Sequence, residues 1–345
     1  MPDSSPTISL WLDGRQSIQL GRKGLAGSPP VIKVHMHDSS HGATLVLPGY
    51  QPSTRTFSLR AALQSGAFSL FDAESQSKIS VPQESLPPAE LPAPPGAPLK
   101  LITIHLDASS PFWTSLLRPG HTYNLGWTHS SPTAPYAYRS PGTPRLPVRL
   151  SEKLISYRVL DASTSTLSFS LSVTPTHPVC NMSGTPPFGF KLEIASHHDT
   201  PVTLCLDKTP LKELHGLEEI VAVEDEDGHQ VEWDYGIGCW EDDGPARFPG
   251  DATFEEVAPG KPYERMFWLS KVDDGYYGGD LGDLEKGKRY RGEVSRTLLG
   301  VLGSCREGRK EELLAGTEEE KKERWGGGGK VVFVDVSDPF TFETV

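Results

Sequence analysis

Apolar and polar residues alternate most regularly over residues 167–173. The apolar positions of this segment are Leu167, Phe169, Leu171 and Val173, and a serine separates each from the next. Because successive side chains of a strand point to opposite faces, this pattern predicts a strand with one buried and one polar face. The segment 99–106 has the same period, and we expect Ile102, Ile104 and Leu106 to face a core.

Short apolar runs bounded by turn-forming residues predict further strands along the whole chain. In the first half they are 8–12, 31–36, 43–47, 67–71, 78–81, 123–127 and 155–159. In the second half they are 188–194, 202–206, 220–223, 230–233, 263–269, 289–294, 331–334 and 340–345. Hairpins are expected to join 31–36 to 43–47, 67–71 to 78–81, and 220–223 to 230–233, the last through an Asp-Gly turn.

A turn motif that ends in a tyrosine occurs in both halves of the chain. Its copies are Leu117-x-x-Gly120-x-x-Tyr123 and Leu284-x-x-Gly287-x-x-Tyr290, with a looser third copy in Val257-x-Pro259-Gly260-x-x-Tyr263. In a tyrosine corner, the hydroxyl of a tyrosine near the start of a strand hydrogen-bonds to the backbone just upstream. We therefore expect one tyrosine corner in each half.

The repeated motif indicates a duplicated β-sandwich. Each half also has a Pro-Pro dipeptide before an early strand, at 29–30 and 186–187. The length of 345 residues suits two domains. We predict an all-β fold of two tandem Ig-like or fibronectin-like β-sandwiches with long loops, over 1–162 and 163–345. The first carries a proline-rich loop at 84–98, and the second a charged insertion at 306–329 that can form a helix.

Composition and charge narrow the classes of partner. The chain has 34 Gly and 31 Pro residues, which suits many turns, and only 36% hydrophobic residues. Its net charge of −12 disfavours binding to nucleic-acid phosphates and to anionic membranes. The first residues lack the basic start and apolar core of a secretory signal, and no apolar run reaches membrane-spanning length. We expect a cytoplasmic protein with no nucleic-acid or membrane partner.

The four cysteines, Cys180, Cys205, Cys239 and Cys305, lie in the second half. None forms a Cys-x-x-Cys pair, which makes a structural zinc site unexpected. In a reducing compartment we expect free thiols, with Cys205 in a strand core. In an oxidising compartment, one or two disulfides within the second domain are the alternative.

The segment 117–125, Leu-Arg-Pro-Gly-His-Thr-Tyr-Asn-Leu, resembles the sequence before strand F of fibronectin type III modules. The wider pattern is a Ser/Thr-rich opening strand, tyrosine turns and a terminal Pro-Phe-Thr-Phe-Glu-Thr-Val segment. It resembles a group of filamentous-fungal proteins with a paired β-sandwich layout. The resemblance implies a fold and supplies no catalytic motif.

His35, His37 and His41 form the sharpest candidate for chemistry. His35 and His37 are two apart on a predicted strand and share a face, and His41 follows in the turn. Imidazoles so placed can bind a divalent transition metal. The spacing partly resembles the first metal motif of cupins, which has a glutamate where His41 stands. The alternative for these residues is a polar strand surface followed by a polar turn. His197 and His198 are a second candidate, and the alternative for them is an ordinary polar turn.

Aromatic residues in two glycine-rich loops are the other candidates. Tyr235, Trp240, Tyr276 and Tyr277 suit a contact surface, and the alternative is two loops that pack on each other. Acidic residues around the first loop, including 224–227, are expected to form a solvated rim.

Three functions follow as hypotheses. The first is a non-catalytic intracellular binding or scaffolding protein that recognises a partner through loop aromatics or an exposed sheet edge. The second is a metal-dependent enzyme centred on His35, His37 and His41. The third is an accessory protein of a biosynthetic pathway that binds a small molecule. The chain lacks Gly-x-Ser-x-Gly, and its glycine run at 326–329 lacks the Lys-Ser/Thr of a phosphate-binding loop.

Overall fold

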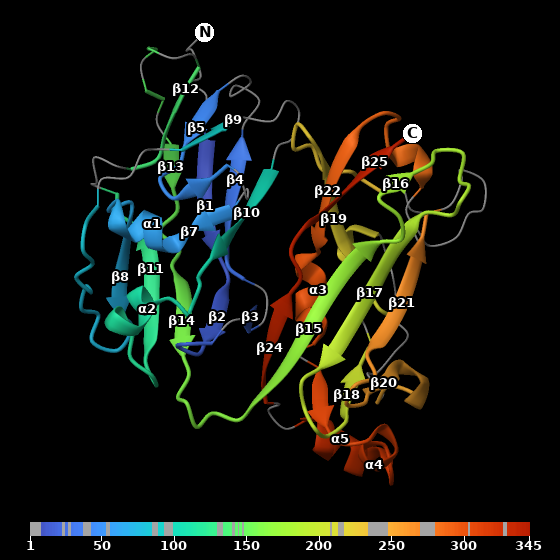
Figure 1. The fold of residues 1–345 in the computed structure, drawn as a ribbon. Helices are drawn as coiled ribbons and strands as arrows, with labels where there is room; N and C mark the ends of the chain where they lie inside the picture. The colour runs from blue at the N-terminus through green and yellow to red at the C-terminus, as the bar shows by residue number, and fades with distance from the viewer. Residues whose placement is uncertain are drawn as a thin grey trace. The chain divides into compact units, whose positions relative to one another are not determined.

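The computed structural model describes most of the chain. The described residues are 8–22, 25–26, 29–36, 43–52, 56–84, 89–92, 99–129, 134–139, 142–143, 145–146, 148–207, 209–212, 217–233, 248–269, 280–302, 304–326 and 330–345. The chain divides into an N-terminal unit, Met1–Thr164, and a C-terminal unit, Ser165–Val345. Each is mainly β and contains several sheets that form a β-sandwich-like domain (Figure 1).

Short strands and two short helices build the N-terminal unit. Its elements are β1 (Ile8–Asp13), β2 (Arg15–Ile18), β3 (Leu25–Ala26), β4 (Val31–Met36), β5 (Thr44–Val46), β6 (Tyr50–Gln51), β7 (Thr56–Ser58), α1 (Leu59–Gln64), β8 (Phe68–Asp72), β9 (Glu90–Pro92), β10 (Leu99–His105), α2 (Pro111–Leu116), β11 (Thr122–Trp127), β12 (Tyr136–Tyr138), β13 (Val148–Leu150) and β14 (Ile155–Val159). One sheet has the order β13-β1-β4-β10-β7-β6, a second contains β3-β2-β14-β11-β8, and a third is β12-β5-β9.

The C-terminal unit begins with the long strand β15. Its elements are β15 (Thr166–Pro175), β16 (Val179–Cys180), β17 (Gly189–Ser196), β18 (Val202–Cys205), η2 (Leu217–Glu219), β19 (Val221–Asp225), η3 (Asp251–Thr253), β20 (Phe254–Val257), β21 (Tyr263–Trp268), η4 (Leu281–Asp283), β22 (Arg289–Val294), α3 (Arg296–Val301), β23 (Cys305–Glu307), α4 (Lys310–Leu313), α5 (Glu318–Gly326), β24 (Val331–Val336) and β25 (Phe340–Thr344). The sheet orders are β21-β17-β15-β24, β16-β25-β22-β19 and β20-β18-β23.

The two units share one pattern of strand pairing. In the N-terminal unit β1 runs parallel to β13 and antiparallel to β4, which pairs in turn with β10. In the C-terminal unit β15 runs parallel to β24 and antiparallel to β17, which pairs with β21 (Figure 1). The second sheets correspond as β2-β14-β11-β8 and β16-β25-β22-β19, each with its first pair parallel and the others antiparallel. The match extends the repeat from one motif to the pairing of four strands in each of two sheets.

The alternating segments bury the predicted face. The apolar positions of 167–173 are at most 1% exposed, and Ile102, Ile104 and Leu106 are buried. Tyr123, Leu125 and Trp127 are buried in β11 as well. The alternation therefore fixes which face of each strand packs into the core.

Several local predictions are wrong. Segments 31–36 and 43–47 form no hairpin, because β4 lies between β1 and β10 while β5 pairs with β12 and β9. The predicted loop at 84–98 contains β9, and β12 lies in the segment 128–147, for which no strand was predicted. The six-residue helices α1 and α2 are too short for a helical period to show in sequence. Serine side chains cap both, with Ser58 Oγ accepting from Ala61 N and Ser110 Oγ from Phe112 N.

The charged insertion at 306–329 forms helices, as its composition allows. It contains α4 and α5, and it begins within β23. Across the part of the chain that the structure describes, no helix combines the length and the apolar character needed to span a membrane.

Candidate functional site

A tyrosine corner closes the N-terminal unit. The Tyr123 hydroxyl accepts a 2.9 Å hydrogen bond from the backbone N–H of Arg118. Gly120 has φ +83°, a conformation that favours glycine. Its N–H donates to the Val159 carbonyl over 2.9 Å, and Val159 N–H donates to the His121 carbonyl over 2.8 Å. The corner thus ties the turn to the last strand of the unit.

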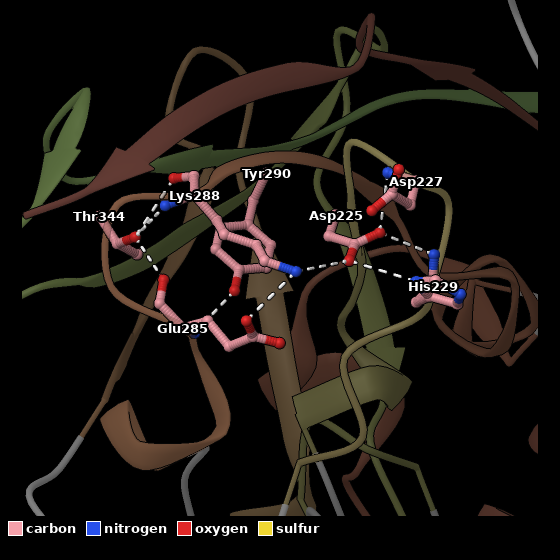
Figure 2. Close-up of polar contacts among 7 residues, drawn as sticks. All are labelled: Asp225, Asp227, His229, Glu285, Lys288, Tyr290 and Thr344. Atoms are coloured by element: carbon pink, nitrogen blue, oxygen red, sulfur yellow. Dashed lines mark hydrogen bonds and ion pairs between the residues drawn. The ribbon is translucent and has the colours of Figure 1, made fainter.

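The same arrangement closes the C-terminal unit. The Tyr290 hydroxyl accepts a 2.7 Å bond from Glu285 N–H (Figure 2). Gly287 has φ +79°, and its N–H donates to the Thr344 carbonyl over 3.1 Å. Thr344 N–H returns to the Lys288 carbonyl over 3.0 Å. Both predicted corners are confirmed, and the two match bond for bond.

The third copy of the motif forms a turn without a corner. Gly260 has φ +67°. The structure shows no hydrogen bond from the backbone of this turn, residues 257–262, to the Tyr263 hydroxyl. That hydroxyl interacts with Arg265, while burial raises its pKa.

An aspartate fastens a hairpin to the N-terminal corner. Asp72 lies opposite Tyr123 in the register of β8 and β11. Its Oδ1 accepts from Ser75 N over 2.9 Å and from Glu74 N over 3.1 Å, and its Oδ2 lies 3.0 Å from His121 Nδ1. The Ser75 N–H, and next the His121 imidazole, lower the pKa of Asp72 to about 2.

Asp225 plays the same part in the C-terminal unit, opposite Tyr290 in the register of β19 and β22. Its Oδ1 accepts from His229 N over 2.8 Å and from Asp227 N over 3.0 Å. Its Oδ2 lies 3.3 Å from His229 Nδ1 and 3.4 Å from Lys288 Nζ (Figure 2). Burial raises the pKa of Asp225, but these hydrogen bonds outweigh it and the net shift is downward.

We call these two arrangements the corner clamps: Asp72 with His121, and Asp225 with Lys288. Asp225 was expected in a solvated rim, and that prediction is wrong because its side chain is only 9% exposed. Acidic residues in a row do not show which of them turns inward to accept backbone N–H groups.

The C-terminal clamp also groups possible metal ligands. One ligand atom each of Asp225, Asp227 and His229 lies within 4.8 Å of the others. However, both Asp225 oxygens already accept hydrogen bonds, and the charge of the Lys288 ammonium, 3.4 Å from Oδ2, disfavours a cation beside this carboxylate. The N-terminal clamp has the same geometry, with His121 in place of Lys288. A structural role in the fold explains both copies.

The predicted histidine cluster is described only in part. His35 lies on β4 with its ring nearly parallel to that of Trp11, at 9° and 6.0 Å between ring centroids. His37 and His41 lie outside the described residues, so the metal site stays a prediction. In the second histidine pair, His198 Nε2 accepts from Ser168 N over 2.8 Å and thereby joins the β17–β18 turn to β15.

The predicted contact aromatics Tyr235, Trp240, Tyr276 and Tyr277 all lie outside the described residues. Their role in binding stays a prediction.

An exposed row crosses one sheet of the N-terminal unit. Trp11 on β1 and Leu101 on β10 both stand opposite Lys33 on β4. Trp11 is 44% and Leu101 49% exposed. Lys33 Nζ forms a 2.8 Å ion pair with Asp13. The row is therefore apolar at both ends, and the lysine at its centre shares the Asp13 carboxylate with Lys153.

The corresponding sheet of the C-terminal unit carries a related row. Met266 on β21 and Thr174 on β15 stand opposite Lys191 on β17, and Lys191 pairs with Glu264 over 2.7 Å. Met266 is 37% exposed, and Trp268, two residues on, is 50% exposed.

Sequence reasoning passed over both tryptophans, although alternation marks them. Trp11 lies between the buried Leu10 and Leu12, and Trp268 follows the buried Phe267. Because successive strand residues point to opposite faces of a sheet, each tryptophan points away from the face on which its neighbours are buried.

The described cysteines are free thiols. Burial raises the pKa of Cys180 to about 11 and that of Cys305 to about 12. Cys205 is half-buried at the end of β18, so its predicted place in a strand core is wrong. Cys239 lies outside the described residues. Thiols with raised pKa values are poor nucleophiles.

No family model and no curated protein matches the chain. Among solved structures, the chain is similar to a tetra-tandem repeat from the extending region of a large adhesion protein, at 9% identity and a TM-score of 0.16. That match covers 98% of this chain and 50% of the other. A BSP domain of a biofilm-associated protein matches at 10% identity and TM-score 0.13, covering 99% and 29%.

A type II cohesin dyad from the adaptor ScaA scaffoldin of Acetivibrio cellulolyticus matches at 8% identity and TM-score 0.15, covering 64% of each chain. This chain spans about half the length of the adhesion-protein structure that it matches. TM-scores this low carry no argument about what this chain does.

Proposed function

We propose that this chain is a non-catalytic binding or scaffolding protein made of two Ig-like sandwiches that recognise a protein partner. The observation that carries the proposal is the pair of exposed rows on corresponding sheets, Trp11–Lys33–Leu101 and Thr174–Lys191–Met266. We call these the outer rows. The finer fold assignment draws on the matched corners, the shared strand pairing and the fibronectin-like segment at 117–125.

The chemistry of the outer rows favours a protein partner. Tryptophan is enriched among the residues that dominate binding energy at protein interfaces. Removing apolar surface from water contributes about 25 cal/mol per Å², so an exposed Trp11 or Trp268 offers a gain that only a partner can realise. The central lysines are paired with acids, which leaves the rows without a strong net charge to attract phosphate.

We propose in addition that the protein is cytoplasmic. We propose no nucleic-acid or membrane partner, because the net charge of −12 repels phosphate groups. The loop aromatics predicted from sequence would extend the binding surface. The resemblance of the chain to filamentous-fungal proteins with a paired β-sandwich layout is also part of this proposal.

Site-specific photocrosslinking tests the proposal. A photoreactive p-benzoylphenylalanine placed at Leu101, within the N-terminal outer row, is compared with one at Val179, which is 41% exposed and lies outside both rows. In native lysate, the Leu101 probe should crosslink to a defined partner protein, identified by its crosslinked peptide, and the Val179 probe should not. A Trp11→Ser change in the same protein should abolish the Leu101 crosslink.

The contrary result is equally concrete. Equal crosslinking from both positions, or a Leu101 crosslink that survives Trp11→Ser, would mean that the rows do not select a partner. Turnover of a metabolite by the purified chain, without any crosslinked partner, would support the metal-dependent enzyme instead.

A further inference from the structure

Strand β21 is the last strand of the sheet β21-β17-β15-β24 (Figure 1). Its counterpart in the N-terminal unit, β10, pairs with β4 on one side and with β7 on the other. Among the described residues, β21 pairs with β17 alone. An edge strand presents a row of unpaired N–H and C=O groups that another strand can bind. The C-terminal unit therefore exposes backbone groups where the N-terminal unit pairs part of its own.

The hydrogen bonds show which backbone groups of β21 point away from the sheet. The Leu269 N–H donates to the Phe188 carbonyl over 2.9 Å, so the backbone of Leu269 faces the preceding strand. The N–H and C=O of one strand residue point to one side, and those of the next residue point to the other. In the register of β17 and β21, the groups of Glu264, Met266 and Trp268 therefore point outward.

The edge lacks two features that keep sheet edges from pairing with other chains, proline and the β-bulge. The six residues of β21 include no proline, and they pair with β17 in an unbroken register. The Glu264 carboxylate forms an ion pair with Lys191 over 2.7 Å. Met266 is 37% and Trp268 50% exposed. The edge thus offers both backbone groups and apolar side chains to a further strand.

A second copy of β21 fits this edge in one symmetric antiparallel register. A two-fold axis at Met266 sets this residue opposite its own copy and Glu264 opposite Trp268, so that outward backbone groups face outward groups. On the inner face the same axis sets Arg265 opposite Phe267. An axis at Arg265 or at Glu264 would set like charges directly opposite each other, which destabilises a strand pair. An axis between two residues would set outward groups against inward ones, and an axis at Phe267 or beyond shortens the overlap.

We propose that two copies of the chain form an antiparallel dimer by pairing their β21 edges, with Met266 at the two-fold axis. The outward N–H and C=O groups of Glu264, Met266 and Trp268 then gain partners, and the sheet continues from one copy into the other. One strand pair buries less than the about 1,200 Å² of a standard interface, so we expect a weak dimer with a Kd of about 10–100 µM.

The dimer goes beyond the proposed function and is tested separately from it. Because Met266 belongs to the C-terminal outer row, pairing at β21 joins the rows of the two copies. The crosslinking test of the proposed function instead uses Leu101, in the N-terminal outer row. A chain that stays monomeric leaves the Leu101 crosslink intact, and a chain without that crosslink is still able to dimerise.

Sedimentation velocity on the full chain between about 2 and 200 µM measures the dimer, and the weight-average sedimentation coefficient should rise with concentration. Met266→Lys sets two like charges opposite each other at the axis and should raise the dimer Kd at least about fivefold. Val179→Lys is the matched control, since Val179 is 41% exposed and lies on β16, away from this edge. It should change the Kd by less than about twofold.

Mixing Met266→Lys with Met266→Glu tests the register. Each variant alone should dimerise poorly, whereas the equimolar mixture should recover a Kd within about threefold of the unaltered chain, because opposite charges then meet at the axis. Recovery also shows that both variants are folded. A mixture that associates no more tightly than the single variants would overturn the register, and with it the proposal.

Photocrosslinking identifies the occupant of the edge. A p-benzoylphenylalanine at Trp268 should crosslink in native lysate to the peptide of a second copy that contains Glu264. A crosslink to a different protein instead would assign the edge to that protein and overturn the proposal. A chain that stays monomeric up to about 200 µM, or equal effects of Met266→Lys and Val179→Lys, would overturn it as well.

Discussion

Asp72 Oδ2 lies 3.0 Å from His121 Nδ1, and this contact joins the hairpin after β8 to the turn before β11. Asp225 and Lys288 meet at the corresponding place in the C-terminal unit, over 3.4 Å. In both units the aspartate stands opposite the corner tyrosine. The basic partner differs while the aspartate keeps its place, which indicates that the fold uses an aspartate at this point and accommodates either basic side chain beside it.

Replacing Asp72 by asparagine should make stability less dependent on pH. An unfolded aspartate has a pKa near 3.9, and the folded pKa of Asp72 is about 2. A carboxyl with a depressed folded pKa stabilises the protein above the unfolded value and loses this contribution as pH falls toward the folded one. We expect Asp72→Asn to be less stable than the unaltered protein at pH 7 and to approach it between about pH 4 and pH 2.

Urea denaturation at pH 7, 4 and 2 measures this difference. Asp199→Asn, at an exposed aspartate outside both clamps, is the control and should change little at any pH. If Asp72→Asn lowers the free energy of unfolding by the same amount at every pH, the shape of the Asp72 side chain, and not its charge, explains how the clamp stabilises the unit.

Removing the hydroxyl of a corner tyrosine should destabilise its unit. Tyr123→Phe leaves the Arg118 N–H without its acceptor, and Tyr290→Phe does the same to Glu285 N–H. A hydrogen bond contributes about 0.5–1.5 kcal/mol net, so we expect each change to lower the free energy of unfolding by about 1 kcal/mol in urea titrations.

Tyr157→Phe is the matched control. Its hydroxyl is buried and finds no hydrogen-bond partner among the described residues. Because a buried polar group without a partner costs free energy, its removal should be neutral or stabilising by up to about 1 kcal/mol. A loss at Tyr157 equal to that at Tyr123 would contradict the role given to the corner bonds.

The tyrosine corners could be predicted from sequence because every part of each one lies within seven residues. The spacing from Leu284 to Tyr290 contains the turn glycine, the buried leucine and the bonded tyrosine together. Alternation likewise predicts β15 and its buried face, since a period of two is set by the strand alone.

Features that depend on distant segments could not be predicted. The apolar runs at 31–36 and 43–47 identify two strands, but they do not show that these strands belong to different sheets. The burial of Asp225 follows from backbone N–H groups that turn toward it, which an acidic run does not reveal. One pocket of the C-terminal unit is lined by both Cys205 and Trp325, which lie 120 positions apart in the sequence, and no local pattern predicts that they meet.

The described thiols should differ in reactivity. Cys180 and Cys305 are buried with pKa values raised to about 11 and 12, whereas Cys205 is half-buried. Since the thiolate is the reactive form, N-ethylmaleimide at pH 7.5 should label Cys205 first, and the other two at rates limited by unfolding. Peptide mass spectrometry gives the rates, and urea should make all three react alike. Rapid labelling of Cys305 in the folded chain would contradict its burial.

His198→Ala should lower the free energy of unfolding by about 1 kcal/mol, because Ser168 N–H loses the imidazole acceptor that joins β15 to the β17–β18 turn. His197→Ala, at the exposed adjacent residue, is the matched control and should stay within about 0.5 kcal/mol of the unaltered protein. Urea titration with and without zinc separates this structural role from metal binding. Equal losses in both variants without zinc would contradict the role given to the His198 bond, and zinc stabilisation that disappears with either histidine would assign the pair to a metal.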